Sequence, residues 1–445
     1  MSEISHGQLR SAFVPNSREL VGLEVESAVV DPETGRAAHY LGVRGVRTVL
    51  ETALSEWGGR PLLDTEHLIG LELPDGSRLS LEHGGQLEYS GAPMPSLASA
   101  VKRMREVLTG TARLLDRLGL ALLPGGYVPF DTIDTISWVP LGRNGLMRSH
   151  FSRLGGAGSD APRILGLSLS TQVHLDYLSE EDFTRKLRMQ AVASPVVAAL
   201  LVNSPLADGR LDGLLSHRSQ AWLRTDPERC NVLPPAVRPG VCVDDFVDWA
   251  LGLSMLYYID PEGEFRKAPD RPFRALLRDG FDDGTVPTLD HWNQLLDQIW
   301  THVRVRRTLE LRAADGPAYR HIPAFAALWV GLTYHAPSRD AAWDLLGDRP
   351  EGDYQAATSE LPAGGLRTKL GKDQVGELAA ELLRLARQGL RARVDAGVEP
   401  PSVLGHLDPL EEILHTGETF AEQCARRWVS DFKCDPGHYV RAYRV

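Results

Sequence analysis

The chain has 445 residues, 43% of them apolar, with a formal net charge of −11 and an isoelectric point of about 5.7. This acidic balance, without a basic stripe, argues against a nucleic-acid-binding protein. The four cysteines include no Cys-x-x-Cys pair, which argues against a zinc cage and a disulfide framework.

Neither a secretion signal nor a membrane span is visible. The first ten residues lack a basic start followed by an apolar core. The longest nearly apolar run, 191–202, is too short to span a bilayer and fits a buried helix. We therefore expect a cytoplasmic protein that binds small molecules, neither membrane nor nucleic acid, and works as a monomer or homodimer.

The predicted elements mix strands and helices. The helix at 95–119 begins at Pro-Ser and ends at a glycine, and Pro195 is expected to kink or break the helix that contains it. In chain order we expect strands at 20–30 and 78–90, a helix at 95–119, a strand at 168–177, a helix at 179–205, a strand at 303–313 and a helix at 374–393. The Gly/Ser-rich stretch 153–163 is either a mobile lid or an ordinary surface loop.

Each long strand has an apolar and a polar face, because successive side chains of a strand point to opposite faces. In the first strand, Leu23 and Val25 share one face, and Glu24 and Glu26 share the other. The polar faces of the later strands hold Gln172, His174 and Asp176, and then Arg304, Arg306, Glu310 and Arg312 if the strand 303–313 runs without a bulge.

The stretch 78–90 is predicted to form a hairpin. A two-residue turn at its double glycine would place Glu82 and Glu88 on opposite faces. A three-residue loop, 83–85, instead places Glu82 opposite Gln86 and gathers the polar residues on one face. Glycine suits the left-handed position of such a loop. We therefore predict the three-residue loop.

These polar faces have two interpretations. Each strand taken singly is most simply an antiparallel strand with a solvated outer face. If the faces converge, each pair of like charges about 4 Å apart repels by roughly 4 kcal/mol at an effective dielectric near 20. Either the pKa values of the carboxyl groups then rise steeply or cations bind. Oxygen ligands without cysteine suit Mg²⁺ or Mn²⁺, and metal-bound carboxylates beside arginines suit phosphate groups. The second interpretation is a metal-dependent phosphoryl-handling enzyme without a P-loop.

Six motifs strengthen the second interpretation. Together they resemble the glutamate–cysteine ligases of the plant and proteobacterial type, including the related actinobacterial enzymes, from about residue 20 to the C-terminus. The motifs are VGLEVE (21–26), SLEHGGQLEYSGAP (80–93), TQVHLD (171–176), VNSPLADG (202–209), SHRSQAW (216–222) and LELRAADG (309–316).

The resemblance implies an α+β fold like the catalytic core of glutamine synthetase: a curved, mainly antiparallel sheet forming a funnel, with helices outside. It implies a single ligase catalytic domain over 1–445, with a helical part at about 340–445. The implied reaction uses ATP to phosphorylate the γ-carboxylate of glutamate. The amine of cysteine then attacks the γ-glutamyl phosphate and expels phosphate, a leaving group whose charge metals and arginines can hold.

The resemblance also implies roles for single residues. Arg312 would contact the transferring phosphoryl group, with Arg304 assisting at the nucleotide, and Arg148 and Arg218 would anchor substrate carboxylates. For each arginine the alternative is a surface ion pair. The ligands of Mg²⁺ or Mn²⁺ would be Glu24, Glu26, Glu82, Glu88 and Glu310, with Gln172 a further candidate, and Glu82 and Glu88 would also be catalytic.

Three positions depart from the family pattern. His83 and Ser254 stand where Pro is usual, and His174 stands where Asn is usual. His174 either touches metal or substrate or is a hydrogen-bonded structural residue. Ser254 lies in a segment near the acceptor pocket, so a γ-glutamyl ligase for a different amine is the main alternative. A kinase that stops at phosphorylation and a regulatory pseudoenzyme are further alternatives, and the intact carboxylates argue against the pseudoenzyme.

Overall fold

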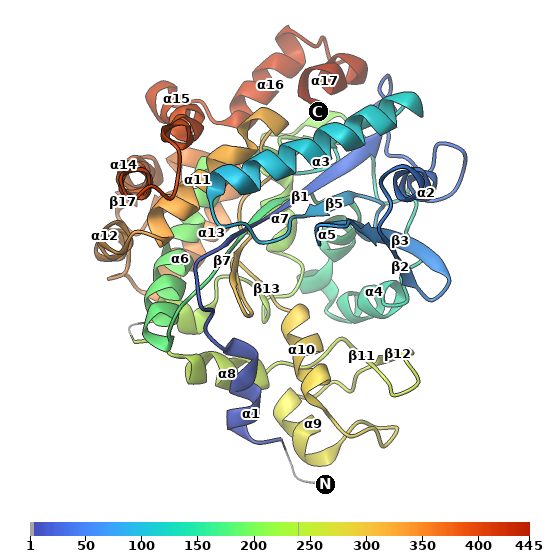
Figure 1. Ribbon diagram of the computed structural model, residues 1–445, viewed down its shortest axis with the longest axis vertical. Coiled ribbons are helices and arrows are strands. Elements are labelled where there is room, and N and C mark those ends of the chain that lie inside the picture. Colours follow the sequence, from blue (N-terminus) through green and yellow to red (C-terminus); the bar gives the residue numbers. More distant parts are fainter. Residues whose placement is uncertain (1–3, 239) are drawn as a thin grey trace.

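An antiparallel sheet forms the centre of the computed structural model, which describes residues 4–238 and 240–445 (Figure 1). Within these residues the sheet has nine strands: eight follow the order β14-β15-β7-β1-β5-β4-β3-β2, and the ninth, β6, pairs with the second half of β1. The strands are β1 (Val21–Val30), β2 (Arg60–Asp64), β3 (His67–Glu72), β4 (Arg78–Leu81), β5 (Leu87–Ser90), β6 (Ala121–Pro124), β7 (Thr171–Leu175), β14 (Val303–Val305) and β15 (Leu309–Leu311).

Short strand pairs and helices make up most of the remaining described chain. The pairs are β8 (Leu206–Ala207) with β9 (Arg210–Leu211), β10 (Cys230–Asn231) with β13 (Trp300–Thr301), β11 (Tyr257–Ile259) with β12 (Phe265–Lys267), and β16 (Lys369–Leu370) with β17 (Asp373–Gln374). The α-helices are α1 (His6–Arg10), α2 (Val46–Trp57), α3 (Leu97–Arg117), α4 (Asn144–Arg153), α5 (Ala161–Leu167), α6 (Glu180–Leu200), α7 (His217–Trp222), α8 (Val243–Leu251), α9 (Phe273–Asp279), α10 (Leu289–Asp297), α11 (Ile322–Thr333), α12 (Ala336–Leu346), α13 (Glu351–Gly364), α14 (Val375–Asp395), α15 (Asp408–Thr416), α16 (Phe420–Ser430) and α17 (Pro436–Tyr443).

Helices cover the apolar face of the sheet. α3 runs along β1, β5 and β6, and α11 packs against β7 (Figure 1). Leu23 and Val25 of β1 belong to the same buried core as Leu97 and Met104 of α3. Because side chains alternate along a strand, the polar residues of β1 point to the opposite face. The predicted α+β class, a mixture of helices and antiparallel sheet, is confirmed, and the funnel shape stays a prediction.

The predicted three-residue loop between β4 and β5 is present. The Glu82 amide donates to the Gln86 carbonyl at 2.9 Å, and Leu81 lies opposite Leu87. Gly85 has a φ of +86°, which favours glycine over residues with a side chain. The register that separates polar from apolar residues is therefore the observed one.

The predicted continuous strand at 303–313 is wrong. β14 ends at Val305 and β15 begins at Leu309, and the Arg306 amide donates to the Thr308 carbonyl at 2.9 Å across the turn. The polar run at 306–308 forms this turn. Arg304 still lies opposite Glu310, because residues of equal parity pair across this hairpin and keep a common face.

Two smaller predictions also need correction. α6 runs from Glu180 to Leu200 without interruption, so Pro195 does not break it. Nearly the whole second half of this helix is buried, and that packing outweighs the one hydrogen bond that proline removes. The stretch 153–163 is more regular than a loop, since it includes a 3₁₀-helix at Gly155–Gly158 and the start of α5. Whether it acts as a lid stays a prediction.

Candidate active site

Cross-strand register brings the polar side chains of three strands together. Glu24 of β1 lies opposite Gln172 of β7, and Glu26 of β1 lies opposite Glu88 of β5. Directly opposed residues of an antiparallel pair project to the same face of the sheet. The polar residues of β1, β5 and β7 therefore share one surface.

The β14–β15 hairpin extends this surface with a carboxylate between two arginines. Glu310 lies opposite His174 of β7, and Arg304 lies opposite Glu310. Arg304 Nη1 donates to Glu310 Oε2 at 2.9 Å, and Arg312 Nε lies 3.3 Å from Glu310 Oε1. Residues more than 200 positions apart in the chain thus meet at one site.

Direct contacts hold several of these side chains in place. Gln172 Nε2 donates to Glu26 Oε1 at 3.0 Å. Ser90 Oγ donates to Glu88 Oε1 at 2.6 Å. His174 Nε2 lies 3.3 Å from an oxygen of Glu24, so His174 touches the carboxylate cluster. These contacts fix the direction of the carboxylates before any ligand arrives.

Burial and mutual repulsion raise the pKa of two of the carboxyl groups. Burial, and then the charge of Glu82, raise the pKa of Glu26 to about 7. Burial, and then the charges of Glu24 and Glu82, raise the pKa of Glu88 well above its ordinary value. The cluster therefore gathers more negative charge than its surroundings neutralise, and a divalent cation would relieve this excess.

The carboxyl group of Glu310 shifts in the opposite direction. Burial works against its ionisation, but Arg304 and Arg312 outweigh burial and lower the pKa of Glu310 to about 2. Burial, and then the charge of Arg304, lower the pKa of Arg312 to about 10. At neutral pH the site therefore presents a fixed anion between two cations.

The donor atoms of the cluster suit a hard divalent cation. Glu24, His174 and Glu310 each offer a ligand atom within 4.8 Å of the others. In the described part of the chain, Gln172 Oε1 is buried without a hydrogen-bond partner, and a cation would satisfy this acceptor. A set dominated by oxygen, with one imidazole and no thiolate, fits Mg²⁺ or Mn²⁺.

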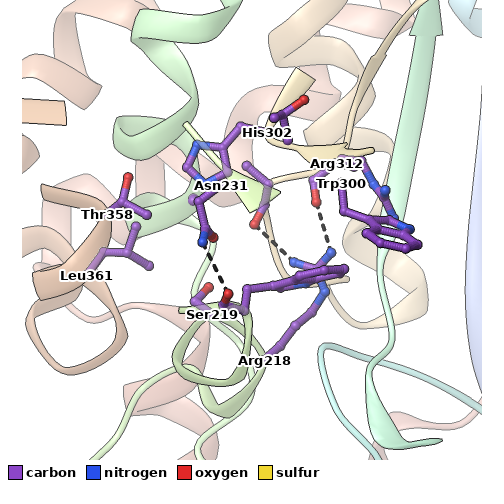
Figure 2. A pocket seen from close by; sticks show the side chains of 12 residues that line it. Arg218, Ser219, Asn231, Trp300, His302, Arg312, Thr358 and Leu361 are labelled. Atoms are coloured by element: carbon purple, nitrogen blue, oxygen red, sulfur yellow. Dashed lines mark hydrogen bonds between the residues drawn. The ribbon is translucent and has the colours of Figure 1, made fainter. Parts of the chain in front are cut away.

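Two cavities adjoin the cluster and share Trp222, Trp300 and Arg312 as lining residues. The first, called here the carboxylate cavity, is further lined by Glu26, Glu82, His83 and Gln86 and by apolar side chains such as Phe151 and Leu165. The second, called here the arginine cavity, is further lined by Arg218, His302, Asn231 and Thr358 (Figure 2).

Arg218 lies in the wall of the arginine cavity and is 1% exposed. Its Nη1 donates to the Ala313 carbonyl at 3.0 Å and its Nη2 donates to the Arg312 carbonyl at 2.9 Å (Figure 2). The guanidinium carbons of Arg218 and Arg312 lie 5.9 Å and 5.7 Å from the ring centre of Trp222. One indole therefore faces both cations, an arrangement that holds them side by side.

Arg148, the other predicted carboxylate anchor, is placed elsewhere. Its side chain is exposed on α4, and its guanidinium lies 4.7 Å from the ring centre of Trp138. Arg148 is not among the described residues that line either cavity. The short motif around Arg148 has no regular alternation of apolar and polar residues, so the sequence did not indicate which way this side chain points.

Two of the three departures from the family pattern lie beside residues of the carboxylate cluster, and the third, Ser254, contacts a buried ion pair. His83 is buried beside Glu82 and is hydrogen-bonded to Asn144. His174 contacts Glu24, as described above. The carbonyl and hydroxyl oxygens of Ser254 accept hydrogen bonds from Arg229 at 2.8 and 3.3 Å, and Arg229 is itself paired with Asp226.

Sequence reasoning missed Ser90, Trp300 and His302. Ser90 continues the alternation that begins at Glu88, so the strand pattern could have found it. Trp300 belongs to a two-residue strand and His302 follows directly after it. An element this short has no periodicity that could assign a side chain to a face.

A family model described as glutamate–cysteine ligase family 2 matches residues 20–439. The chain belongs to this family. Membership makes the protein an ATP-dependent ligase, confirms the predicted resemblance and enzyme class, and implies ATP and a divalent metal in general terms.

Curated relatives agree with this assignment, and a solved structure is similar in fold. The chain is 30% identical over 427 residues to glutamate–cysteine ligase B of Oryza sativa subsp. japonica, covering 93% of the chain and 81% of the relative. It is 31% identical over 404 residues to the glutamate–cysteine ligase of Brassica juncea, covering 90% and 76%. The glutamate–cysteine ligase of Francisella tularensis, solved with AMP, is similar in fold at a TM-score of 0.56 and 12% identity, covering 96% of this chain and 89% of that one.

The comparisons correct the predicted localisation. The rice, Brassica and Arabidopsis relatives are chloroplastic enzymes, which contradicts the cytoplasmic location expected from the sequence. That expectation depends partly on the cysteine spacing, which does not separate the cytoplasm from another reducing compartment. Separately, no helix among the described residues has the length and apolarity to cross a bilayer.

Proposed function

We propose that this protein joins the γ-carboxylate of glutamate to the amine of cysteine, using ATP and passing through γ-glutamyl phosphate. The observation that carries the proposal is the surface of carboxylates, Gln172 and arginines that β1, β5, β7 and the β14–β15 hairpin share in a chain of glutamate–cysteine ligase family 2. Phosphoryl transfer to a carboxylate gathers negative charge, and such a surface can hold that charge through cations.

The carboxylate cluster is the proposed metal site. Its ligands for Mg²⁺ or Mn²⁺ are drawn from Glu24, Glu26, Glu82, Glu88, Gln172 and Glu310. A divalent cation held by these residues would supply positive charge to the phosphate groups of the nucleotide. The charge of Glu82 raises the pKa values of both Glu26 and Glu88. In this proposal Glu82 and Glu88 are also catalytic, because their charge favours cation binding.

The arginines divide the remaining work. Arg312 lies at the junction of the two cavities, where it can stabilise charge on the transferring phosphoryl group. Arg304 orients Glu310 and assists at the nucleotide. Arg218 lies in the arginine cavity with an Nε that has no hydrogen-bond partner among the described residues, so a substrate carboxylate is its natural partner. The exposed position of Arg148 gives no support to a substrate role.

We further propose that residues 1–445 act as one catalytic domain, as a monomer or homodimer. The helical part at about 340–445 is tied to the sheet layer: Glu399 accepts from the Leu97 amide of α3 at 2.7 Å, and the Val445 amide donates to the Leu122 carbonyl of β6 at 3.0 Å. In this proposal the sheet curves into the wall of a funnel whose inner surface carries the carboxylates.

A direct assay tests the function. The purified protein is incubated with ATP, Mg²⁺ and glutamate, with and without cysteine, and phosphate release and γ-glutamylcysteine are measured. Phosphate release that is no faster with cysteine than without an amine would reject the proposal. A panel of other amines in the same assay tests the alternative acceptor, and a phosphorylated product without amide formation would identify a kinase.

A further inference from the structure

The lining of the arginine cavity includes the imidazole of His302, which is neither a proposed metal ligand nor a proposed substrate contact. His302 lies between β13 and β14 and lines the cavity together with Arg218 and Arg312 (Figure 2). Among the described residues that line this cavity, these two arginines are the charged groups and none is a carboxylate. His302 is therefore the ionisable group of this lining that can offer a lone pair to a proton.

The backbone, rather than the ring, holds His302 in position. Its amide donates to the Asn231 carbonyl at 2.6 Å, and its carbonyl accepts from the Arg312 amide at 3.1 Å. The residue is 8% exposed, and in the described part of the chain Nδ1 is buried without a hydrogen-bond partner. A structural histidine in a core normally has such a partner, as His150 has in Asp226. Backbone hydrogen bonds thus hold His302 in position, while Nδ1 of its ring has no hydrogen-bond partner among the described residues.

The surroundings keep this imidazole neutral in the unliganded protein. Burial, and then the charge of Arg218, lower the pKa of His302 to about 3. The ionisable groups nearest to it in the cavity lining are Arg218 of α7 and Arg312 after β15, and the adjoining strands carry Cys230 on β10 and Arg304 on β14. Burial raises the pKa of the Cys230 thiol, so Cys230 carries no charge. A substrate carboxylate on Arg218 would offset the cation and make the ring a better proton acceptor.

We propose that His302 takes the proton that the ammonium group of the acceptor must lose before its nitrogen can attack. This inference rests on the proposed function, because it needs an amine acceptor and an acyl phosphate. The carboxylates on the sheet are the proposed metal ligands, so they are committed to cations. His302 lies outside that set and next to Arg312, which is the proposed contact of the phosphoryl group.

In the proposed step, His302 and the departing phosphate each take one proton from the acceptor nitrogen. One N–H bond of the ammonium breaks, and its proton joins the ring nitrogen of His302. The freed electron pair of the amine forms the C–N bond to the carbonyl carbon of the γ-glutamyl phosphate, while the bond from that carbon to the phosphate oxygen breaks and the phosphate leaves with its electrons. A second N–H proton passes to the departing phosphate, which leaves a neutral amide. The imidazolium then returns its proton to solvent.

The test compares two acceptors that differ in protonation. At neutral pH the amine of cysteine is largely an ammonium ion, whereas hydroxylamine is largely the free base. In the His302→Asn variant we expect ligation of cysteine to slow by about 10²–10⁴-fold, the usual contribution of a general base. Formation of γ-glutamyl hydroxamate from hydroxylamine should fall by less than about tenfold, because this acceptor needs no base to become nucleophilic.

A pH profile gives a second readout. The rate of the variant with cysteine should rise with pH as the free amine accumulates, so that the deficit relative to wild type shrinks. His415→Asn on α15 is the matched control, since His415 is exposed and distant in sequence from both cavities. A thermal unfolding curve and a second variant, His302→Gln, check that the loss does not come from misfolding.

The possible outcomes separate the two proposals. Equal losses with both acceptors in both variants, or no loss with cysteine, would overturn the role of His302. If the wild-type protein forms neither γ-glutamylcysteine nor γ-glutamyl hydroxamate, the proposed function itself fails. If wild type forms the hydroxamate but the His302 variants lose the same activity with both acceptors, the proposed function is retained and only the inference about His302 is rejected.

Discussion

At the scale of single residues, neighbouring charges give identical carboxyl groups opposite properties. Glu26 and Glu310 are both buried on one face of the sheet. Glu26 faces the charge of Glu82, and its pKa rises to about 7, whereas Glu310 sits between Arg304 and Arg312, and its pKa falls to about 2. Burial alone would have raised both pKa values, so the partner decides the sign.

The raised pKa of Glu26 predicts a pH-dependent stability in metal-free protein. The unfolded chain loses this proton near the ordinary value of 4.5, whereas the folded protein holds it up to about 7. Within this window the folded state binds more protons, so rising pH lowers the free energy of unfolding. Thermal unfolding of wild type and Glu26→Gln between pH 4.5 and 7.5 should show a steeper decline for wild type. Parallel curves would contradict the shift.

Neutralising two members of the cluster should separate activity from folding. We expect Glu82→Gln combined with Glu88→Gln to reduce ATP turnover at least 10³-fold, because cation binding loses two ligands. The metal-free variant should unfold at the same temperature as wild type or higher, since like-charge repulsion falls. Phosphate release and calorimetry measure the two effects. Glu360→Gln combined with Glu412→Gln, at exposed helical positions, is the control, and unchanged turnover in the active-site variant would reject the metal site.

At the scale of elements, the helix behind the sheet is anchored by a distant carboxylate. Glu399 accepts from the amides of Leu97 and Ala98 in the first turn of α3, at 2.7 and 3.1 Å. Arg393 Nη2 in turn donates to Glu399 at 3.3 Å. A carboxylate at a helix N-terminus satisfies free amides and complements the helix dipole. This contact fixes α3 against the strands that carry the carboxylate cluster.

Removal of this anchor should destabilise the whole protein. Glu399→Ala leaves two helix amides without their acceptor and removes one of the two carboxylates that pair with the buried Arg393, the other being Glu19. We expect a loss of about 3 kcal/mol in the free energy of unfolding. Glu399→Gln keeps one acceptor and should lose less. Urea unfolding measures both variants against wild type. If Glu399→Ala matched wild type within error, the anchor would be energetically irrelevant.

At the scale of the molecule, the C-terminal helices complete a core that begins near the first strand. Phe130 lies with its ring centre 5.5 Å from Trp428 of α16 and 5.2 Å from Tyr439 of α17. Val30 and Leu123 of the sheet belong to the same buried cluster. Distant parts of the chain therefore share one apolar core, which is what a single folding unit requires.

Deletion of residues 420–445 tests the single-domain proposal. Without α16 and α17 the sheet-side half of this core is exposed, and we expect loss of cooperative unfolding together with aggregation. Circular dichroism melting and gel filtration would report both changes. Removing only Arg444 and Val445 is the milder control. A truncated protein that melts cooperatively as a monomer would show that the helical part is a separate unit.

Local chemistry accounts for the predictions that succeeded. Alternation placed Glu24 and Glu26 on a polar face, and the hairpin register followed from the need to keep Glu82 and Glu88 together. Each of these inferences uses a period of two residues or a turn of three, distances over which backbone geometry alone decides where a side chain points. The reaction was inferred from the family resemblance, because the alternation of side chains along a strand does not identify a reaction.

The sequence by itself thus determined the polar faces, the Glu82 hairpin and the main helices, because these depend on contacts between residues close along the chain. Only the tertiary structure decided that Glu24, Gln172 and Glu310 lie on adjoining strands and that residues 303–313 form a hairpin. It also decided that His302 lines the arginine cavity, whereas Arg148 lines neither cavity. Strand order, burial and the charges around a group arise from packing between segments that are distant in the sequence. Local sequence patterns do not predict which of these segments will be in contact.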